Sequence, residues 1–527
     1  MGTKIMSWLR KMNIWTKLAG AIFGLTTVFT IWMLWTIASL NMLPMKYLVL
    51  VIVLVVLLLL GAFCTLFLPQ FGTKKGEKKQ LNRGKRYGLR LCGLVLSLCI
   101  VLVDAVGIKM ISELQNAIVD ITGDGEEVAY EIVGLYVLAE DSASKLEDVA
   151  EYNLGVSYAY NKDSIETAVD RMNKAFSKAK EIEWNEYSTV LDAVNALLTG
   201  ESNAILMNVA YVSILEGVEG YEDIQSRIKV IHEFEMEDTS TPVINLATKP
   251  KDVTKEPFIV YVSGHDTNYS LKNQRSDVNI LAVVNPVTKQ VLLINTPRDY
   301  FVDLVGSKGG DGQKDKLTHC GIYGIECSMA TLSALYDQDV HYYAEVNFVG
   351  FTRLIDAMGG ITVYSDATFY ASQSDTQIYK GENNLNGKEA LGFVRERYNL
   401  PDGDAARGRH QMAVIQAIVK KAASGAILTH YTDILSSMGS CFGTNLTNEE
   451  ASNLVKMQIN DMASWNIKSI SVAGDGYGER NYCFSIPGQS VYVLPQNATY
   501  VEYAQKLIDK VFDGAVLTDE DLVLPAQ

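Results

Sequence analysis

The cysteines of this 527-residue chain lack the spacing of a metal site. Positive charge is also scarce after the first hundred residues. Residues 1–109 hold 14 Lys and Arg against two acids, which leaves 32 Lys and Arg against 59 Asp and Glu in the remainder. Contacts to nucleic-acid phosphates need a basic footprint, so the acidic remainder argues against nucleic-acid binding as the function. The two regions face different surroundings.

Cysteine usage leaves the redox state of the soluble part open. Cys441 and Cys483 are equally well interpreted as a disulfide of an oxidising exterior or as buried free thiols, and the same holds for Cys320 and Cys327. The other three cysteines lie in apolar segments. The cysteine count therefore does not fix the compartment.

The N-terminal region lacks the single short apolar run and small-residue cleavage site of a cleavable signal peptide. It has three longer runs, near 18–40, 47–68 and 91–108, each close to the ~20 residues that span a bilayer as a helix. The loop after the second run carries eight Lys and Arg against one Glu, which the positive-inside rule places in the cytoplasm. Three spans then predict an anchor at 1–109 in the cell membrane and an extracytoplasmic remainder. If the third run, which contains Asp104, were only an interfacial helix, the remainder would lie inside.

Turn-forming and helix-breaking residues divide the soluble part. Residues 110–238 alternate strand-like and helical patterns and predict a small α/β accessory domain, for which we expect a spacer or protein-binding role. Residues 239–257, rich in Thr, Pro and Lys, predict a linker. A larger α/β domain with a mixed sheet flanked by helices is expected at 258–515, followed by a tail at 516–527.

The larger domain brings acids and an arginine to one edge of its sheet. Two apolar strands joined by an Asn-Pro turn predict a hairpin, which places Asp277 beside Arg298 and Asp299. If the preceding strand is antiparallel to this hairpin, Asp266 reaches the same edge. Two close carboxylates repel unless a cation lies between them, so Asp266 and Asp277 are candidate Mg²⁺ ligands. Taken singly, either aspartate is more readily a turn-former.

Further donors follow in the same domain. Arg395 and Arg397 share one face of the chain if their segment is extended, and Arg407 and Gln411 lie one helical turn apart. A guanidinium group is planar, stays protonated and binds phosphate oxygens in pairs, so several arginines together suit a pyrophosphate.

These residues belong to a series of ordered motifs. The motifs are Ser-Gly-His-Asp-Thr at 263–267, Arg-Ser-Asp at 275–277, Thr-Pro-Arg-Asp at 296–299, Val-Asn-Phe at 346–348, the blocks at 354–361 and 385–391, Arg395-x-Arg397, and Asp404-x-x-Arg407 with Gln411. The series resembles the LytR-CpsA-Psr family, and three spans followed by an accessory domain resemble its capsule-associated CpsA branch. The resemblance implies a phosphotransferase that moves a glycopolymer, such as capsular polysaccharide or teichoic acid, from polyprenyl pyrophosphate in an apolar groove to peptidoglycan.

The resemblance also implies roles for single positions. Asp266 and Asp277 match magnesium-binding acids, Arg298 matches an arginine that contacts the pyrophosphate, and Arg275 matches a basic position beside it. Asp299 is expected to hold arginines in place or, like Asp277, to serve as the general base. Asp404 is expected to hold an arginine. The positions that match further head-group ligands are Arg395, Arg397, Arg407 and Gln411, of which the first two are also expected to act in catalysis.

The chain departs from the family pattern at two positions. His265 stands where many members have Ile before the first aspartate, and His410, next to Arg409, stands where many have a second Arg before Gln411. Either change is expected to alter substrate preference or the pH profile.

Two other functions remain open from sequence. The same residues could end the reaction with water, which would make the protein a polyprenyl-pyrophosphate hydrolase. A non-catalytic envelope regulator is disfavoured, because the short cytoplasmic part leaves no room for a helix-turn-helix domain.

Overall fold

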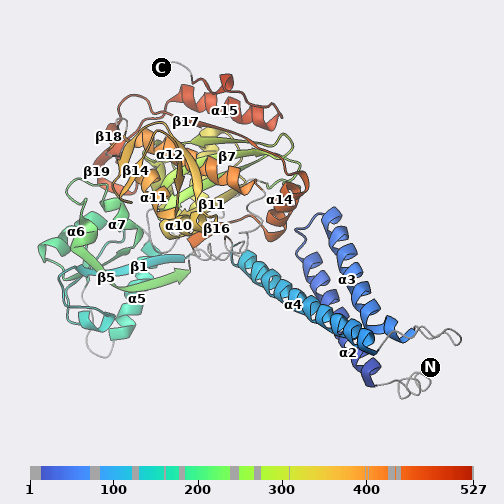
Figure 1. Cartoon of the computed structure of the whole chain (residues 1–527). Coiled ribbons are helices and arrows are strands. Elements are labelled where there is room, and N and C mark those ends of the chain that lie inside the picture. Colours follow the sequence, from blue (N-terminus) through green and yellow to red (C-terminus); the bar gives the residue numbers. More distant parts are fainter. Residues whose placement is uncertain are drawn as a thin grey trace. The chain divides into compact units, whose positions relative to one another are not determined.

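The computed structural model divides the chain into two compact units (Figure 1). One unit comprises residues 1–120 with 448–462, and the other comprises 121–447 with 463–527. The described residues are 14–71, 83–121, 130–159, 162–176, 184–237, 248–265, 274–307, 309–397, 399–400, 403–424, 434 and 441–524.

Three long apolar helices form most of the first unit. They are α2 (Ile14–Ser39), α3 (Met45–Phe71) and α4 (Arg83–Ile121), and each is long and apolar enough to cross a membrane. Thr30 of α2 donates a hydrogen bond from Oγ1 to Oδ2 of Asp104 in α4 at 2.7 Å, and both side chains are buried. The acid in the third run is therefore paired with a polar partner inside the helix group, as polar residues in membrane segments usually are.

The first unit also contains α14 (Asn448–Asp461), a helix from far along the chain. The Lys456 Nζ atom donates to Asn41 Oδ1 at 2.9 Å, and Lys46 Nζ donates to the carbonyl oxygen of Asn460 at 2.8 Å. Asn41 lies in the turn between α2 and α3, and Lys46 lies in the first turn of α3. These two lysine contacts therefore join α14 to the turn between α2 and α3 and to the first turn of α3.

The accessory domain is built on a five-stranded sheet with strand order β3-β2-β4-β1-β5. Local patterns predict a strand at 130–138 and helices near 164–178 and 188–198, and β1, α5 and α6 lie within two residues of these positions, whereas α7 and α8 are not predicted. A capping box between Thr189 and Asp192 begins α6, and Gly200 in the left-handed conformation ends it. The elements are β1 (Tyr130–Leu138), β2 (Leu154–Val156), α5 (Lys162–Phe176), β3 (Trp184–Glu186), α6 (Val190–Thr199), β4 (Ala204–Asn208), α7 (Ala210–Leu215), α8 (Ile224–Arg227) and β5 (Ile228–Glu237).

The larger domain has a six-stranded mixed sheet with strand order β16-β11-β6-β7-β8-β17. Strands β6, β7 and β8 run antiparallel, and Asn285 pairs with Gln290 across the hairpin turn, so the predicted hairpin is confirmed. Strand β11 is parallel to β6, and β17 is parallel to β8. The strands are β6 (Phe258–His265), β7 (Ser276–Asn285), β8 (Gln290–Asn295), β11 (Tyr342–Asn347), β16 (Phe442–Thr444) and β17 (Asn466–Ser471).

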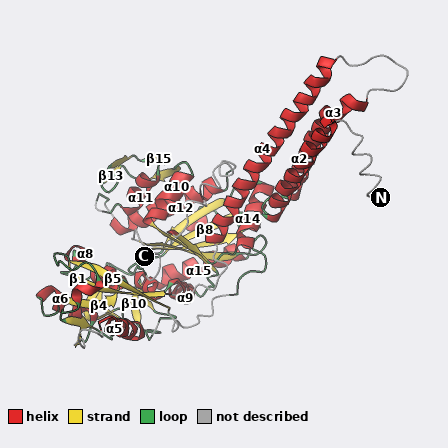
Figure 2. Ribbon diagram, turned by 90° about the horizontal axis from the view of Figure 1, so that it is seen from below, coloured by secondary structure: helices red, strands yellow, loops and turns green. Residues whose placement is uncertain are grey.

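Helices cover both faces of this sheet, which confirms the expected α/β class (Figure 2). Alternate residues of the central strands face opposite sides, so Leu281 packs with α9 (Ile325–Tyr336) and α15 (Ala498–Phe512), whereas Ile280 packs with Met412 of α12 (Gly403–Ala422). The helical pattern of residues 322–336 predicts a single helix there. In the structure, Gly324 has a φ of 107° and separates a 3₁₀ helix at Leu317–Tyr323 from α9.

Two further helices complete the wall beside the sheet edge. Asn347 caps α10 (Phe348–Ala357) by accepting a hydrogen bond from the Gly350 amide at 2.8 Å. Gly359 and Gly360, both with positive φ, follow the end of α10 as the sequence predicts. Helix α11 (Gly387–Arg395) begins at a capping box and lies against α10. The smaller elements are β9 (Phe301–Asp303), β10 (Lys314–Lys316), β12 (Ile361–Ser365), β13 (Phe369–Ala371), β14 (Thr376–Ile378), β15 (Gly381–Leu385), β18 (Glu479–Cys483) and β19 (Ile486–Val493).

Candidate active site at the edge of the sheet

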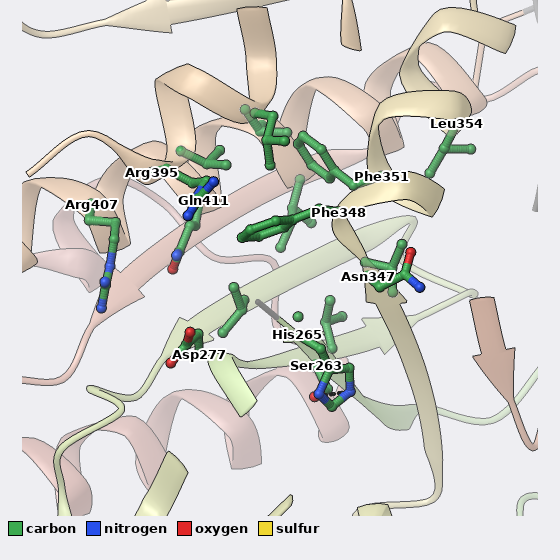
Figure 3. Close-up of a pocket in the computed structure, with 18 of the residues that line it drawn as sticks. Ser263, His265, Asp277, Asn347, Phe348, Phe351, Leu354, Arg395, Arg407 and Gln411 are labelled. Carbon is green, nitrogen blue, oxygen red and sulfur yellow. Dashed lines mark hydrogen bonds between the residues drawn. The ribbon is translucent and has the colours of Figure 1, made fainter. Parts of the chain in front are cut away.

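A cavity of about 380 Å³ lies where β6, β7 and β11 meet α10, α11 and α12. Figure 3 shows Asp277, Arg395, Arg407 and Gln411 on one side of this cavity, and Phe351 and Leu354 on the other side together with Asn347 and His265. The polar lining residues are Ser263, His265, Asp277, Arg298, Asn347, Gln373, Arg395, Arg397, Arg407 and Gln411, and the apolar ones include Val262, Val346, Phe348, Phe351, Leu354, Leu391, Val394, Val414, Ile415, Ile418 and Phe442.

Asp277 and Arg298 form a direct ion pair at the cavity wall. The hairpin places them at neighbouring strand ends, and Arg298 Nη1 donates to Asp277 Oδ1 at 2.7 Å. Burial would raise the pKa of the Asp277 carboxyl, but the positive charges of Arg298, Arg275 and Arg407 outweigh it and hold the pKa well below its usual range. The Asp277 carboxyl is therefore expected to be ionised at neutral pH.

A second set of contacts, outside the cavity wall, holds Arg298 in place. The Asp299 carboxylate lies 3.6 Å from Arg298 Nε and 3.1 Å from Lys316 Nζ, and it is not part of the cavity wall. Its own pKa is lowered, because Lys316 and Arg298 together outweigh the effect of burial. Thr318 adds a hydrogen bond from its amide to the carbonyl oxygen of Arg298 at 2.8 Å.

Arg395 and Arg397 reach the cavity on either side of a buried glutamate. Helix α11 ends at Arg395, and Glu396 has an extended backbone, so both arginine side chains line the cavity. The Glu396 carboxylate accepts hydrogen bonds from the amides of Arg397, Asn399 and Ser372 at 3.0–3.1 Å. These bonds lower its pKa against the opposing effect of burial and fix the turn that presents the two arginines.

Aromatic packing and a close helix approach position the remaining donors. The Arg395 guanidinium carbon lies 4.2 Å from the centroid of the Phe348 ring, a cation–π distance. Arg407 and Gln411 both line the cavity from α12. Between them, Gly408 lies against Asn295 at the end of β8, where any side chain would collide.

The two histidines that depart from the family pattern have different places. His265 lines the cavity, and its Nε2 lies 3.1 Å from Glu345 Oε2. His410 is buried in the core, stacked 4.2 Å from Phe393 and 5.0 Å from Phe369. Since it does not line the cavity, we interpret its role as packing between α11 and α12.

Not every expected residue can be placed. Asp266 and the side chain of Asp404 lie outside the described residues, although His265, directly before Asp266, pairs with Ser276, directly before Asp277. Arg275 does not line the cavity, but its charge acts on Asp277. The cysteines of the larger domain are free thiols.

The described residues contain no group of three or more His, Cys, Asp or Glu side chains able to hold a metal ion. The described residues would therefore supply only some of the ligands of a site for one cation. Asp277 fits such a role, because it lines the cavity as a charged carboxylate whose one oxygen faces Arg298.

A comparison with protein families decides the affiliation. The model of the LytR_cpsA_psr family matches residues 218–510, more than half of the chain. The chain belongs to the LytR-CpsA-Psr family. The series of motifs identified from sequence lies inside the matched region, so the resemblance is confirmed.

Several LytR-CpsA-Psr relatives are similar to this chain. A polyisoprenyl-teichoic acid–peptidoglycan teichoic acid transferase TagU of Bacillus cereus is 35% identical over 223 residues, which cover 42% of this chain and 70% of the relative. A TagU of Bacillus anthracis is 31% identical over 258 residues, covering 49% and 81%. A solved structure of TagT bound to LI-WTA has a TM-score of 0.41 with 26% identity, covering 51% of this chain and 95% of that one.

Proposed function

We propose that this protein is an extracytoplasmic, membrane-anchored transferase that moves a glycopolymer of the capsular polysaccharide or teichoic acid type from polyprenyl pyrophosphate to peptidoglycan. The observation that carries the proposal is the lining of the cavity, which combines four arginines, a carboxylate and other polar side chains with a large set of apolar residues. A polyprenyl pyrophosphate has the same division, an anionic head group on an apolar chain. The names of the TagU relatives support this donor and this acceptor.

The bond changes follow from this substrate pair. A hydroxyl oxygen of peptidoglycan attacks the glycan-linked phosphorus and forms a new P–O bond. The bond from that phosphorus to the bridging oxygen breaks, polyprenyl phosphate leaves with the electron pair, and the proton of the hydroxyl passes to the released phosphate or to solvent. Such a transfer needs positioning and charge neutralisation more than covalent chemistry by the protein. Arg298, Arg395 and Arg397 line the cavity and are the catalytic residues of the proposal, and Arg407 and Gln411 bind the head group.

The two acids at the sheet edge have different tasks in this scheme. Asp299 does not line the cavity, so it acts through Arg298 and Lys316 as a positioning residue. Asp277 lines the cavity, but its lowered pKa makes it a weak base. We therefore propose Asp277 as a ligand for magnesium, with Asp266 as the second ligand. Magnesium bound there would add positive charge for phosphate oxygens that the arginines do not reach.

The proposed topology is supported by α14. This helix lies in the chain between β16 and β17 of the soluble sheet, so it is on the soluble side of the membrane. Its Lys456 contacts Asn41 in the turn between α2 and α3, so that turn is on the same side. The basic loop between α3 and α4 then lies on the opposite side, as the positive-inside rule requires for an extracytoplasmic soluble part.

The test uses the full chain in detergent micelles with a polyprenyl-pyrophosphate oligosaccharide, magnesium and peptidoglycan fragments. The Arg395→Ala, Arg397→Ala double variant is compared with Arg353→Ala, which changes an exposed arginine of α10 outside the cavity. Mass spectrometry is expected to detect wall-linked phosphoglycan with the unchanged protein and Arg353→Ala, and none with the double variant. Equal product from all three proteins would contradict the site, and free glycan phosphate without wall product would indicate a hydrolase.

A further inference from the structure

The accessory domain shares a hydrophobic core with the larger domain. Buried residues of α7, among them Tyr211, Ile214 and Leu215, form one cluster with Ile322 and with β18 and β19 of the larger domain. Interfaces of this kind, in which two domains bury a common apolar core, hold the domains in one arrangement. The accessory domain therefore packs against the 3₁₀ helix at Leu317–Tyr323 and against β18 and β19 of the larger domain.

Helix α7 packs beside this 3₁₀ helix. Tyr211 of α7 packs in one cluster with Ile322, which lies in the 3₁₀ helix directly after β10, and burial and the charge of Asp315 in β10 raise the pKa of Tyr211. Directly after α7, Glu216 Oε2 lies 3.6 Å from Nη2 of Arg275, and the two side chains are 27% and 14% exposed. An acid of the accessory domain is therefore paired with the arginine beside the proposed phosphate site.

Arg275 has capacity for a further ligand. It directly precedes Ser276 and Asp277 in the chain, and its charge acts on the Asp277 carboxylate. Its Nε atom is buried and has no hydrogen-bond partner among the described residues. The distance of 3.6 Å to Glu216 exceeds that of a good charge-assisted hydrogen bond, so the pair is held mainly by charge.

We propose that Glu216 is the counter-ion that Arg275 exchanges for the diphosphate of the donor, so that the accessory domain sets donor affinity. This inference rests on the proposed function, and it adds a positioning residue outside the region matched by the family, which begins at residue 218. In the absence of donor, Glu216 keeps the charge of Arg275, which acts on Asp277, partly neutralised. A diphosphate competes with Glu216 for the guanidinium, and the carboxylate regains Arg275 when polyprenyl phosphate leaves.

The test compares two glutamates that lie three residues apart. Glu216→Gln removes the charge beside Arg275 and keeps the shape of the side chain. Glu219→Gln is the matched control, because Glu219 also pairs with an arginine of the larger domain, Arg480, at 3.4 Å, but both side chains of that pair are mostly exposed. Isothermal titration calorimetry with inorganic pyrophosphate is run on the full chain in micelles, beside the donor KM and the thermal unfolding temperature.

Glu216→Gln is expected to tighten pyrophosphate binding and lower the donor KM by about three- to tenfold, more than for an exposed pair because both groups are largely buried. Glu219→Gln is expected to change neither, and Arg275→Gln is expected to cancel the effect of Glu216→Gln. Weaker binding by Glu216→Gln, no change, or an equal effect of Glu219→Gln would overturn the exchange. Pyrophosphate binding does not depend on transfer, so altered binding without any transfer by the unchanged protein would count against the proposed function alone.

Discussion

Replacing Asp277 by Asn tests how the charged edge of the sheet works. The change keeps the size of the side chain and an oxygen that can accept from Arg298, and it removes the negative charge. The ion pair joins Arg298 Nη1 and Asp277 Oδ1 at 2.7 Å, with side chains that are 21% and 15% exposed. A charge-assisted hydrogen bond in such a place contributes roughly 1.5–3 kcal/mol.

If that energy orients Arg298 toward the transition state, Asp277→Asn lowers kcat/KM by about 10- to 150-fold, since roughly 1.4 kcal/mol corresponds to a factor of ten. Loss of a magnesium ligand would add to this decrease. The assay follows release of polyprenyl phosphate from a lipid donor by the full chain in micelles, with the thermal unfolding temperature measured on the same samples.

The control is Asp303→Asn. Asp303 pairs with Lys314 at 3.0 Å, but both side chains are about half exposed and neither lines the cavity. Exposed pairs contribute little, so kcat/KM should stay within about twofold. A folded Asp277→Asn variant with the kcat/KM of the unchanged protein would refute the reasoning about Arg298.

Three other changes have defined outcomes. His410→Ala removes a ring stacked on Phe393 and should lower the free energy of unfolding by about 2–4 kcal/mol in denaturant titrations, whereas His410→Phe should cost much less. Ile418→Trp narrows the apolar part of the cavity and should raise the KM for a long-chain donor by about tenfold while leaving calorimetric pyrophosphate affinity unchanged. Burial lowers the pKa of His319 despite its contact with Asp315. The folded state therefore favours neutral His319, and this contribution to the free energy of unfolding is fully present above the unfolded pKa of about 6.5. It is lost as the pH falls below that value, because the unfolded state then binds a proton more readily. His319→Gln should therefore flatten the decrease in unfolding temperature below pH 6.5, and an unchanged slope would contradict this assignment.

Much of the fold follows from local sequence patterns. The hairpin of β7 and β8 is predicted by two apolar strands and an Asn-Pro turn, and the same argument brings Asp277 to Arg298. The alternation Arg395-Glu396-Arg397 predicts two arginines on one side, and both line the cavity. These features depend on residues close together in sequence, where the period of a strand or the geometry of a turn decides the arrangement.

The supporting residues could not be predicted in the same way. Lys316 reaches Asp299 only because β10 folds back beside β9, and Glu396 is satisfied by Ser372 from a distant loop. From sequence alone, Phe348 cannot be distinguished from a core residue. Only the folded structure shows that its ring contacts Arg395. The pair of Glu216 and Arg275 joins two domains. Each of these contacts depends on tertiary packing, for which one sequence carries no periodic signal.

Transfer in water enriched in oxygen-18 tests the central claim most directly. The full chain is incubated with a polyprenyl-pyrophosphate oligosaccharide and peptidoglycan fragments, and the phosphorus-containing products are analysed by mass spectrometry. The expected product is a wall-linked phosphodiester without the heavy isotope, because the attacking oxygen comes from a sugar hydroxyl. Free glycan phosphate that carries one oxygen-18 atom, with no wall-linked product, would contradict it and identify water as the acceptor.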